Sequence, residues 1–304
     1  MADARKASNK LPSGVTLFAK QAAAPSVNSA GSQIYAKEVA GSPSAELLLH
    51  FDDDVVDSAN GHSCTATSLG SYVTSGAGTS DGTAGSGLGF DKAADFTGSS
   101  YIVYPDLNLG TADLTISWWA KHDHPNMHTN HFSLDTTGTT AGTGIFFSTS
   151  ASSGSKWGQL WDGSNKIYWD DLTDGSGDWY KRDTGHSSPS AWRHFAITRT
   201  TTSGGNSQWD LFFSGKKCTP HSTLGHGTPK GNWTTTDIGE GGRVGGAMSP
   251  VGAFRGNIDE FAIFKSIEFS GSTYTVPTEP VGGGGAGATK LFVMDSDGLE
   301  TQLG

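Results

Sequence analysis

One nine-residue run constrains the fold more than any other part of the chain. Gly256–Phe264 reads GNIDEFAIF, and its Ile and Phe residues favour a pleated, half-buried strand. Asp259 and Glu260 interrupt this apolar run, and an unpaired carboxylate near a core costs on the order of several kcal/mol. We therefore expect a strand whose two acids are met by a cation, by backbone N–H donors or by a position at the rim of the core.

The rest of the chain repeats short apolar runs between turn signals. Tyr101–Tyr104 and Leu114–Trp119 are two such runs, separated by Pro105 and an Asn-Leu-Gly turn. The 43 glycines among 304 residues are about twice the usual share, and no convincing amphipathic helix pattern appears. This pattern predicts an all-β chain folded as an antiparallel β-sandwich. Sandwiches of about 200–250 residues commonly form one domain, so we expect one domain with tails.

The GNIDEFAIF run resembles the closing strand of laminin-G-like, concanavalin A-like jelly rolls. Further stretches match this family in the expected order: Leu47–His62, Ala94–Asp106, Ala112–Lys121, Ala191–Thr200 and Trp209–Lys217. The resemblance covers roughly residues 45–280. It implies a concanavalin A-like jelly roll with extended N- and C-terminal arms.

We accordingly divide the chain into an N-terminal docking arm over residues 1–44, the jelly roll over 45–280, and a Gly-rich linker with a C-terminal strand over 281–304. Strand-like runs at Ser32–Val39 and Thr289–Gly298 lie on either side of the jelly roll. We interpret the two ends as one module split by an insertion. The alternative is that both ends are disordered linkers, each with a chance strand.

The terminal segments carry a second resemblance. Gln33–Gly41 and Lys290–Leu303 are similar to short segments of bacteriophage virion proteins. This resemblance implies a virion structural protein that docks through its termini on other virion proteins, of the tail or of the capsid. Because unpaired strand edges are templates for strand addition, we also expect a homo-oligomer.

Charge and hydropathy exclude several classes of protein. The formal net charge is −10 and the basic residues are scattered, which argues against a nucleic-acid partner. No run of about 18 or more apolar residues is present, so we expect no membrane insertion. The N-terminal MADARKASNK lacks the apolar region of a signal peptide. We therefore expect synthesis in the host cytoplasm and a final location in the virion.

The jelly-roll resemblance also implies a calcium site. Many such domains hold Ca²⁺ near the loop after the opening strand and the acid of the I-D-E motif. The matching residues are Asp52, Asp54, Asp57 and Asp259. Calcium needs about 6–8 oxygen ligands, which clustered aspartates and carbonyls supply. The alternative is that these aspartates cap turns in an acidic protein.

Aromatic residues interleaved with acids indicate a sugar site. A pyranose presents an apolar face and a rim of hydroxyls, so it is bound by a flat aromatic beside polar groups. The candidate ligand-binding residues are Trp157, Trp161, Trp169, Asp170 and Trp179. The alternative is that these tryptophans fill the sandwich.

Histidine and cysteine leave further alternatives open. The run His122–His131 contains four histidines, which either ligate a transition metal or form a solvated polar loop. Cys64 and Cys218 either form a single disulfide or are small buried hydrophobic side chains.

Catalytic patterns are missing from the sequence. The E-x-D-x-E strand of glycoside hydrolases in this superfamily does not occur, and neither does G-x-S-x-G or H-E-x-x-H. Asp259 and Glu260 are adjacent, and adjacent strand residues point to opposite faces. We interpret the Gly-rich Gly239–Gly246 as a turn-rich loop, because no helix follows it. We therefore expect no enzymatic activity.

These observations lead to one functional hypothesis and two alternatives. The hypothesis is a phage structural protein whose lectin-like jelly roll binds host surface glycans, as in a tail fibre or baseplate. The first alternative is a capsid decoration protein anchored by its terminal arms. The second is a secreted carbohydrate-binding module.

Overall fold

The computed structural model describes most of the chain. The described residues are 9–10, 16–17, 33–38, 45–75, 92–122, 129–134, 144–152, 155–161, 166–170, 192–202, 206–220, 233–234, 238, 241–246, 252–277, 280–281, 289–294 and 300–303. The chain divides into two compact units. One is Ala45–Gly283, and the other combines Met1–Ser44 with Gly284–Gly304.

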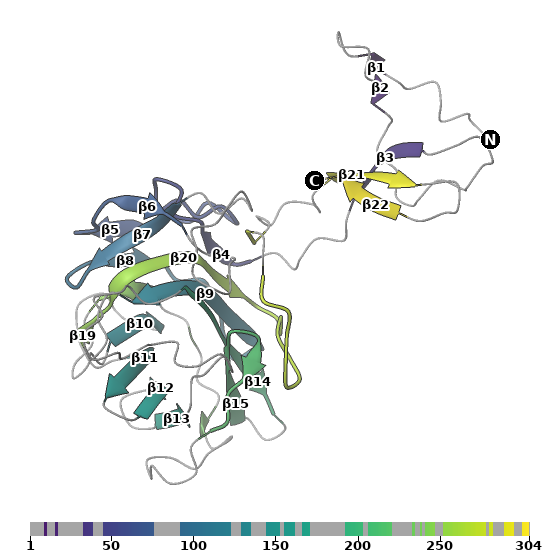
Figure 1. Cartoon of the computed structure of the whole chain (residues 1–304). Coiled ribbons are helices and arrows are strands. Elements are labelled where there is room, and N and C mark those ends of the chain that lie inside the picture. The colour runs from purple at the N-terminus through teal and green to yellow at the C-terminus, as the bar shows by residue number, and fades with distance from the viewer. Residues whose placement is uncertain are drawn as a thin grey trace. The chain divides into compact units, whose positions relative to one another are not determined.

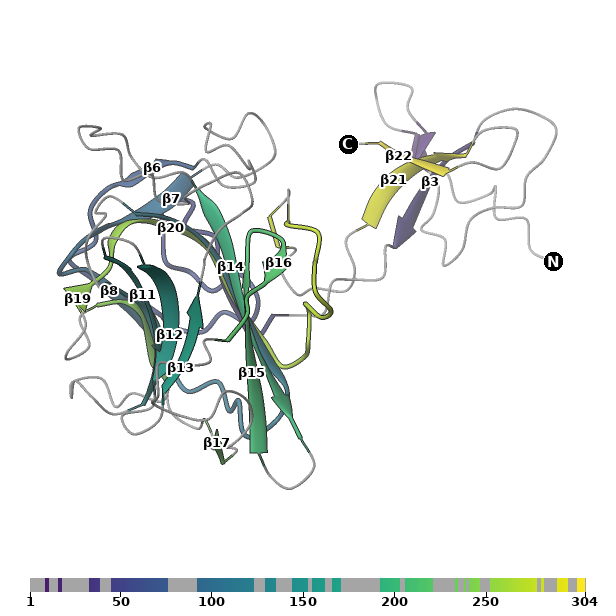
Figure 2. The same ribbon diagram turned by 60° about the horizontal axis from the view of Figure 1, so that its bottom comes forward.

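The larger unit is a sandwich of two sheets, which form the two layers seen in Figures 1 and 2. In strand order, the nine-stranded sheet contains β16 (Lys216–Lys217), β15 (Asn206–Phe213), β14 (Arg193–Thr201), β9 (Leu114–His122), β20 (Arg255–Phe264), β7 (Lys92–Thr97) and β6 (Tyr72–Thr74). Beside this path, β17 (Trp233–Thr234) pairs with β15, and β4 (Leu47–Leu49) pairs with β20.

The eight-stranded sheet forms the second layer. In order, it contains β13 (Lys166–Asp170), β12 (Ser155–Trp161), β11 (Ile145–Ser152), β10 (Thr129–Leu134), β18 (Gly242–Gly245), β8 (Tyr101–Tyr104) and β5 (Thr65–Thr67). The short β19 (Gly252–Ala253) pairs with β10 in parallel, and the other pairings are antiparallel. None of the described residues is helical. The predicted all-β antiparallel sandwich is thus confirmed.

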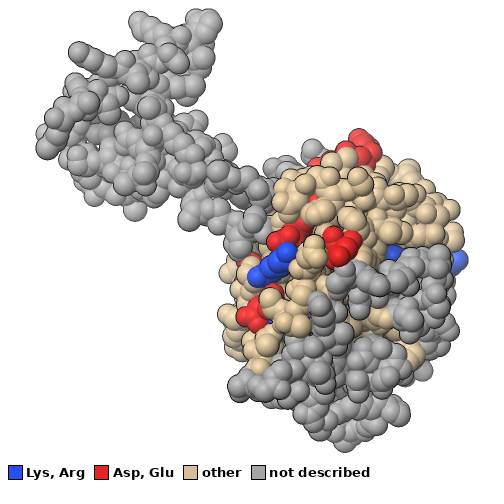
Figure 3. Space-filling model, turned by 180° about the vertical axis from the view of Figure 1, so that it is seen from behind, with Lys and Arg blue, Asp and Glu red and all other residues tan. Residues whose placement is uncertain are grey.

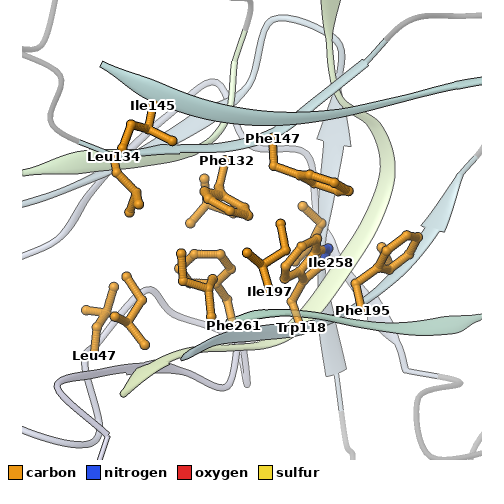
Figure 4. Close-up of a cluster of buried hydrophobic side chains, with 14 of the residues drawn as sticks. Leu47, Trp118, Phe132, Leu134, Ile145, Phe147, Phe195, Ile197, Ile258 and Phe261 are labelled. Carbon is orange, nitrogen blue, oxygen red and sulfur yellow. The ribbon is translucent and has the colours of Figure 1, made fainter. Parts of the chain in front are cut away.

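The core lies between the two sheets and is centred on Trp118 of β9 (Figure 4). Alternate residues of β9, among them Ile116 and Trp118, point inward, as period-2 strands require. The Trp118 ring stacks on Phe195 with centroids 5.3 Å apart and meets Phe132 and Phe147 edge-on at 5.1 and 5.4 Å. Aromatic residues from four strands therefore hold the two layers together.

The closing strand β20 contains a bulge that explains its unusual sequence. Its register with β9 shifts between Asp259 and Ala262, and Glu260 has a positive φ of 50°. Ile258 and Phe261 both belong to the core although they are three residues apart. Without an extra residue, strict alternation would turn one of them outward. Glu260 supplies that residue, so the acid pair lies at the break in the strand pattern.

The predicted turn-rich loop at Gly239–Gly246 is wrong for Gly242–Gly245, which form strand β18 between β10 and β8. Close packing explains the glycine content. A Cβ on Gly242 would lie 2.2 Å from the Tyr104 hydroxyl and 2.3 Å from the Ser133 carbonyl oxygen. Glycine is therefore required here by a close approach within the sheet, which the sequence does not distinguish from a turn.

The smaller unit brings together strands from both ends of the chain. β21 (Thr289–Met294) pairs on one side with β3 (Gln33–Glu38) and on the other with β22 (Glu300–Leu303), and all three are antiparallel. The register runs from Gln33 opposite Met294 to Glu38 opposite Thr289. A separate two-stranded pair consists of β1 (Asn9–Lys10) and β2 (Thr16–Leu17). The boundaries of the docking arm and of the C-terminal segment stay predictions.

Candidate functional site

The outer face of the eight-stranded sheet carries an aligned row of side chains. The inward residues of its strands, such as Phe132, Phe147 and Val244, belong to the core. The residues next to them in sequence face away from it. Strand register aligns six of these in what we call the outer row: Thr65, Val103, Arg243, Ser133, Phe146 and Trp161. The outer row thus crosses six neighbouring strands.

One end of the outer row is aromatic. The rings of Phe146 and Trp161 meet edge-on with centroids 5.1 Å apart, in a cluster separate from the main core. Phe146 is fully buried, whereas Trp161 is half-buried. In the adjacent outward row, buried Gln159 lies opposite half-buried Tyr168. This end therefore combines partly exposed aromatic rings with an amide side chain.

The middle of the outer row is polar. The Arg243 guanidinium carbon lies 4.6 Å from the centroid of the Tyr101 ring, within the range of a cation–π contact. Ser133 lies opposite Arg243 on β10 and is fully buried. Asn130, on the same strand, donates from Nδ2 to the Gly245 carbonyl oxygen at 3.1 Å. A cation and two small polar side chains thus lie beside the aromatic end.

The predicted sugar-binding residues have different positions. Trp161 is in the outer row, and Trp157 pairs with Asp170 across β12 and β13. Trp169 is fully buried in the core. It therefore fills the sandwich, which was the alternative for these tryptophans. Trp179 lies outside the described residues. Sequence reasoning missed Arg243, because it assigned the Gly-rich run around it to a loop.

Among the predicted calcium ligands, Asp57 organises the opening loop. Its carboxylate accepts backbone N–H bonds at 2.9–3.2 Å from Leu48, Ala59, Asn60 and His62. The His62 ring nitrogen Nδ1 lies 2.6 Å from the same carboxylate. Burial on its own would raise the pKa of Asp57, but these donors outweigh burial and lower the pKa. Asp57 therefore caps the turn of the opening loop, which was the alternative to calcium binding for these aspartates.

The other three predicted ligands also have partners within the protein. Asp259 accepts from the Ser75 hydroxyl at 2.5 Å and from the Glu260 backbone N–H at 2.8 Å. Burial and then the neighbouring Glu260 charge raise the pKa of Asp259 well above its ordinary value. Asp52 and Asp54 accept backbone N–H bonds from Lys92 and Val56, at 3.2 and 3.0 Å.

All four predicted calcium ligands thus accept hydrogen bonds from the protein itself. In the described part of the chain, no three His, Cys, Asp or Glu side chains converge as a metal group. The described carboxylates therefore do not form a fitting donor set, and calcium binding at Asp52, Asp54, Asp57 and Asp259 stays a prediction of the sequence.

The second acid of the closing strand has its own donors. Glu260 accepts from the Val281 backbone N–H at 2.7 Å, and its other carboxylate oxygen lies 2.5 Å from His50 Nδ1. Burial lowers the pKa of His50, but the Glu260 carboxylate outweighs it, so the pKa is raised. The two acids thus have different hydrogen-bond partners. Asp259 has a hydroxyl and a backbone N–H group, and Glu260 has a backbone N–H group and an imidazole.

Two histidines of the His122–His131 run lie inside the sandwich, so a solvated loop is wrong for these two. His131 Nδ1 accepts from the indole N–H of Trp118 at 3.0 Å, which leaves the ring proton on Nε2. That nitrogen lies 2.9 Å from the Thr149 hydroxyl and 3.1 Å from His122 Nε2. Burial lowers the pKa of His122 to about 3, so the network is neutral. A protonated Nε2 does not ligate a metal.

The two cysteines are free thiols. Cys64 and Cys218 are both half-buried and pack against the main core. Burial raises the pKa of Cys64 to about 12, so its thiol is unreactive as a nucleophile at neutral pH. The structure therefore supports the buried hydrophobic role over the disulfide.

Comparison with known families agrees with this architecture. Residues 96–267 match the laminin-G model of the concanavalin A-like lectin/glucanases superfamily. The chain belongs to this superfamily. No curated protein sequence matches the chain.

Several solved structures are similar to this chain at low sequence identity. Domain 4 of AbnA, an extracellular arabinanase from Geobacillus stearothermophilus, is 17% identical, with a TM-score of 0.46 over 78% of this chain and 96% of that domain. The receptor binding domain of botulinum neurotoxin mosaic serotype C/D is 16% identical, with a TM-score of 0.40 over 73% of this chain and 48% of the other. The CBM40 of the Ruminococcus gnavus IT-sialidase is 14% identical, with a TM-score of 0.35 over 58% and 90%.

Proposed function

We propose that the sandwich is a non-enzymatic, lectin-like module that binds glycans on the outer face of its eight-stranded sheet. The observation that carries this proposal is the outer row, which brings the partly exposed Trp161 into line with Ser133 and Arg243 across adjacent strands. A flat aromatic face packs on the apolar side of a pyranose, while polar groups bind its hydroxyl rim.

The spacing of the outer row favours an oligosaccharide over a single sugar. Arg243 and Trp161 lie three strands apart, on β18 and β12. With neighbouring strands about 4.8 Å apart, this separation is about 14 Å. A ligand that contacts both ends therefore spans several linked sugars and runs across the strands.

We propose that the protein is a bacteriophage structural protein whose jelly roll binds host surface glycans, in the manner of a tail fibre or baseplate. The terminal sheet supports this proposal, because β3 and β21 come from opposite ends of the chain and flank the sandwich in sequence. Such a unit provides edge strands for docking on other virion proteins or on further copies of this chain, and several copies raise avidity.

Glycan binding is tested with a glycan array probed by the wild-type chain and by Trp161 variants. We expect Trp161→Ala to lose most of the signal and Trp161→Phe to keep part of it, because a smaller flat ring remains. Val56→Ala is the control, since Val56 is 57% exposed and lies on the opening loop. Equal signals for Trp161→Ala and the wild type would place the site elsewhere, and no signal for any variant would contradict glycan binding.

The virion context is tested by gold-labelled antibody against the protein on purified particles, viewed by electron microscopy. Label at the tail is the expected result. Label over the head would favour the alternative of a capsid decoration protein anchored by its arms. Particles without label, with the protein found in culture supernatant, would favour a secreted carbohydrate-binding module.

A further inference from the structure

Three buried polar atoms on the outer face have no hydrogen-bond partner in the described part of the chain. They are Nε of Arg243, Oγ of Ser133 and Oδ1 of Asn130. Ser133 and Asn130 are fully buried, and Arg243 is half-buried. A buried polar group without a partner costs about 1–3 kcal/mol, and native proteins keep few of them without a reason. These three atoms on two adjacent strands mark the surroundings of Arg243, the half-buried member, as a candidate ligand site.

The three atoms lie on the same face of two paired strands. Arg243 on β18 is directly opposite Ser133 on β10. Asn130 also lies on β10, on the other side of the bulge between Asn130 and Phe132. Asn130 Nδ2 is held by the Gly245 carbonyl oxygen, so the orientation of its amide is fixed. The group thus offers a guanidinium donor, a hydroxyl and an amide acceptor on one face.

The charge of Arg243 is not neutralised by the described protein. No Asp or Glu forms an ion pair with it among the described residues, and its one close partner is the Tyr101 ring. By contrast, Lys92 and Lys217 each pair with an aspartate, and Lys265 pairs with Glu46. Arg243 is thus a half-buried cation without a carboxylate partner among the described residues of a chain with a net charge of −10.

The face of the molecule seen in Figure 3 also has few positive charges among the residues it colours. The view of Figure 3 shows acidic and basic groups scattered over a mostly uncharged surface, with no continuous basic patch among the residues it colours. With a net charge of −10, long-range attraction of an anion by the whole protein is not expected. Recognition of an anion here depends on short-range contacts with Arg243.

We propose that the Arg243 group recognises the carboxylate of an acidic sugar, so that the glycan bound by this face contains uronic or sialic acid units. This inference rests on the proposed glycan-binding function. The planar guanidinium fork matches a carboxylate in a bidentate pair, and stacking on Tyr101 orients the fork. Trp161, which is half-buried, stacks on a unit further along the glycan.

The test compares acidic polysaccharides with their neutral counterparts. Polygalacturonate, alginate and polysialic acid, each with its carboxyl-reduced form, are titrated into the full chain by isothermal calorimetry. We expect at least one acidic polymer to bind and its reduced form to bind about 10- to 100-fold more weakly, the range for a lost charge-assisted hydrogen bond. Arg243→Gln should weaken binding of the acidic polymer by the same factor and weaken any binding of the reduced form by less, because only the carboxylate pair is specific to the acidic polymer.

Control variants separate the possible outcomes. Arg243→Lys keeps the charge but not the bidentate fork and should be intermediate, whereas Lys217→Gln removes a charge from the other sheet and should have no effect. Equal binding of acidic and reduced polymers, or full binding by Arg243→Gln, would overturn the carboxylate proposal while leaving glycan binding intact. If neither these polymers nor a neutral glycan array gives binding, the proposed function fails with it. Thermal melting of each variant shows whether the sandwich is folded.

Discussion

At the scale of single residues, carboxylates do two opposite things in this protein. Four backbone N–H donors favour the charged form of Asp57 and lower its pKa, whereas burial and then the Glu260 charge raise the pKa of Asp259. The sequence marked both as acids near apolar strands, and it predicted that the closing-strand acids need donors, a cation or a rim position. It did not predict which donor each acid finds, because Ser75 and Val281 are far from Asp259 and Glu260 in sequence.

Asp259→Asn should stabilise the sandwich at neutral pH. The pKa of Asp259 is raised in the folded state, so the folded chain binds more protons than the unfolded chain above the unfolded pKa of about 4. Wild-type stability therefore falls as pH rises through the folded pKa, and the neutral amide avoids this loss. The measurement is Tm from pH 4 to pH 8, in which the advantage of the variant grows with pH.

The same experiment bears on calcium. A variant that is less stable than the wild type at neutral pH would show that Asp259 is charged and compensated. Melting with added calcium and with EDTA then decides whether the compensation is a metal ion. A calcium-dependent Tm in the wild type that is lost in Asp259→Asn would support the predicted calcium site.

Asp57→Ala should destabilise the chain by about 2–4 kcal/mol at neutral pH, because it leaves the backbone N–H donors of the opening loop without an acceptor. The pKa of Asp57 is lowered on folding, so its contribution is present above the unfolded pKa and is lost as pH falls through the folded pKa. Urea denaturation at neutral and acid pH measures both effects. Asp106→Ala is the control, since exposed Asp106 accepts one N–H bond, from Asn108. Equal losses for both variants would contradict this role.

At the scale of elements, hydrophobic alternation predicted strands correctly, whereas a high glycine content was wrongly interpreted as a loop. The runs around Tyr101–Tyr104 and Leu114–Trp119 became β8 and β9, because period-2 patterning reports which face is buried. β18 was missed because its glycines are required by contacts with Tyr104 and Ser133 on neighbouring strands. Such contacts depend on tertiary packing, so local sequence does not reveal them. The same error concealed Arg243 and, with it, half of the candidate site.

Gly242→Ala should therefore destabilise the sandwich more than an ordinary glycine substitution. Its Cβ would lie 2.2 Å from the Tyr104 hydroxyl and 2.3 Å from a backbone oxygen, so the sheet must shift. We expect a loss of about 3 kcal/mol or more in urea denaturation. Gly271→Ala is the comparison, because a Cβ there meets no atom closer than 4.0 Å and costs only the positive φ, about 1–2 kcal/mol. A smaller loss for Gly242→Ala than for Gly271→Ala would contradict the packing role of β18.

At the scale of the whole molecule, the chain divides into two compact units. The pairing of β3 with β21 gives the N-terminal segment its partner at the other end of the chain. Removal of residues 1–44 should leave the melting transition of the sandwich unchanged and abolish incorporation into particles. Calorimetry and particle purification measure the two effects. Loss of the sandwich transition would show instead that the N-terminal segment belongs to its core.

The central claim is that the outer face of the eight-stranded sheet binds a glycan. The most direct measurement is a crystal structure of the chain with an oligosaccharide selected on the array. The account predicts density for a sugar across the outer row, with one ring on Trp161 and a polar contact to Arg243. A sugar bound on the nine-stranded sheet or around the opening loop, with the outer row untouched, would contradict it.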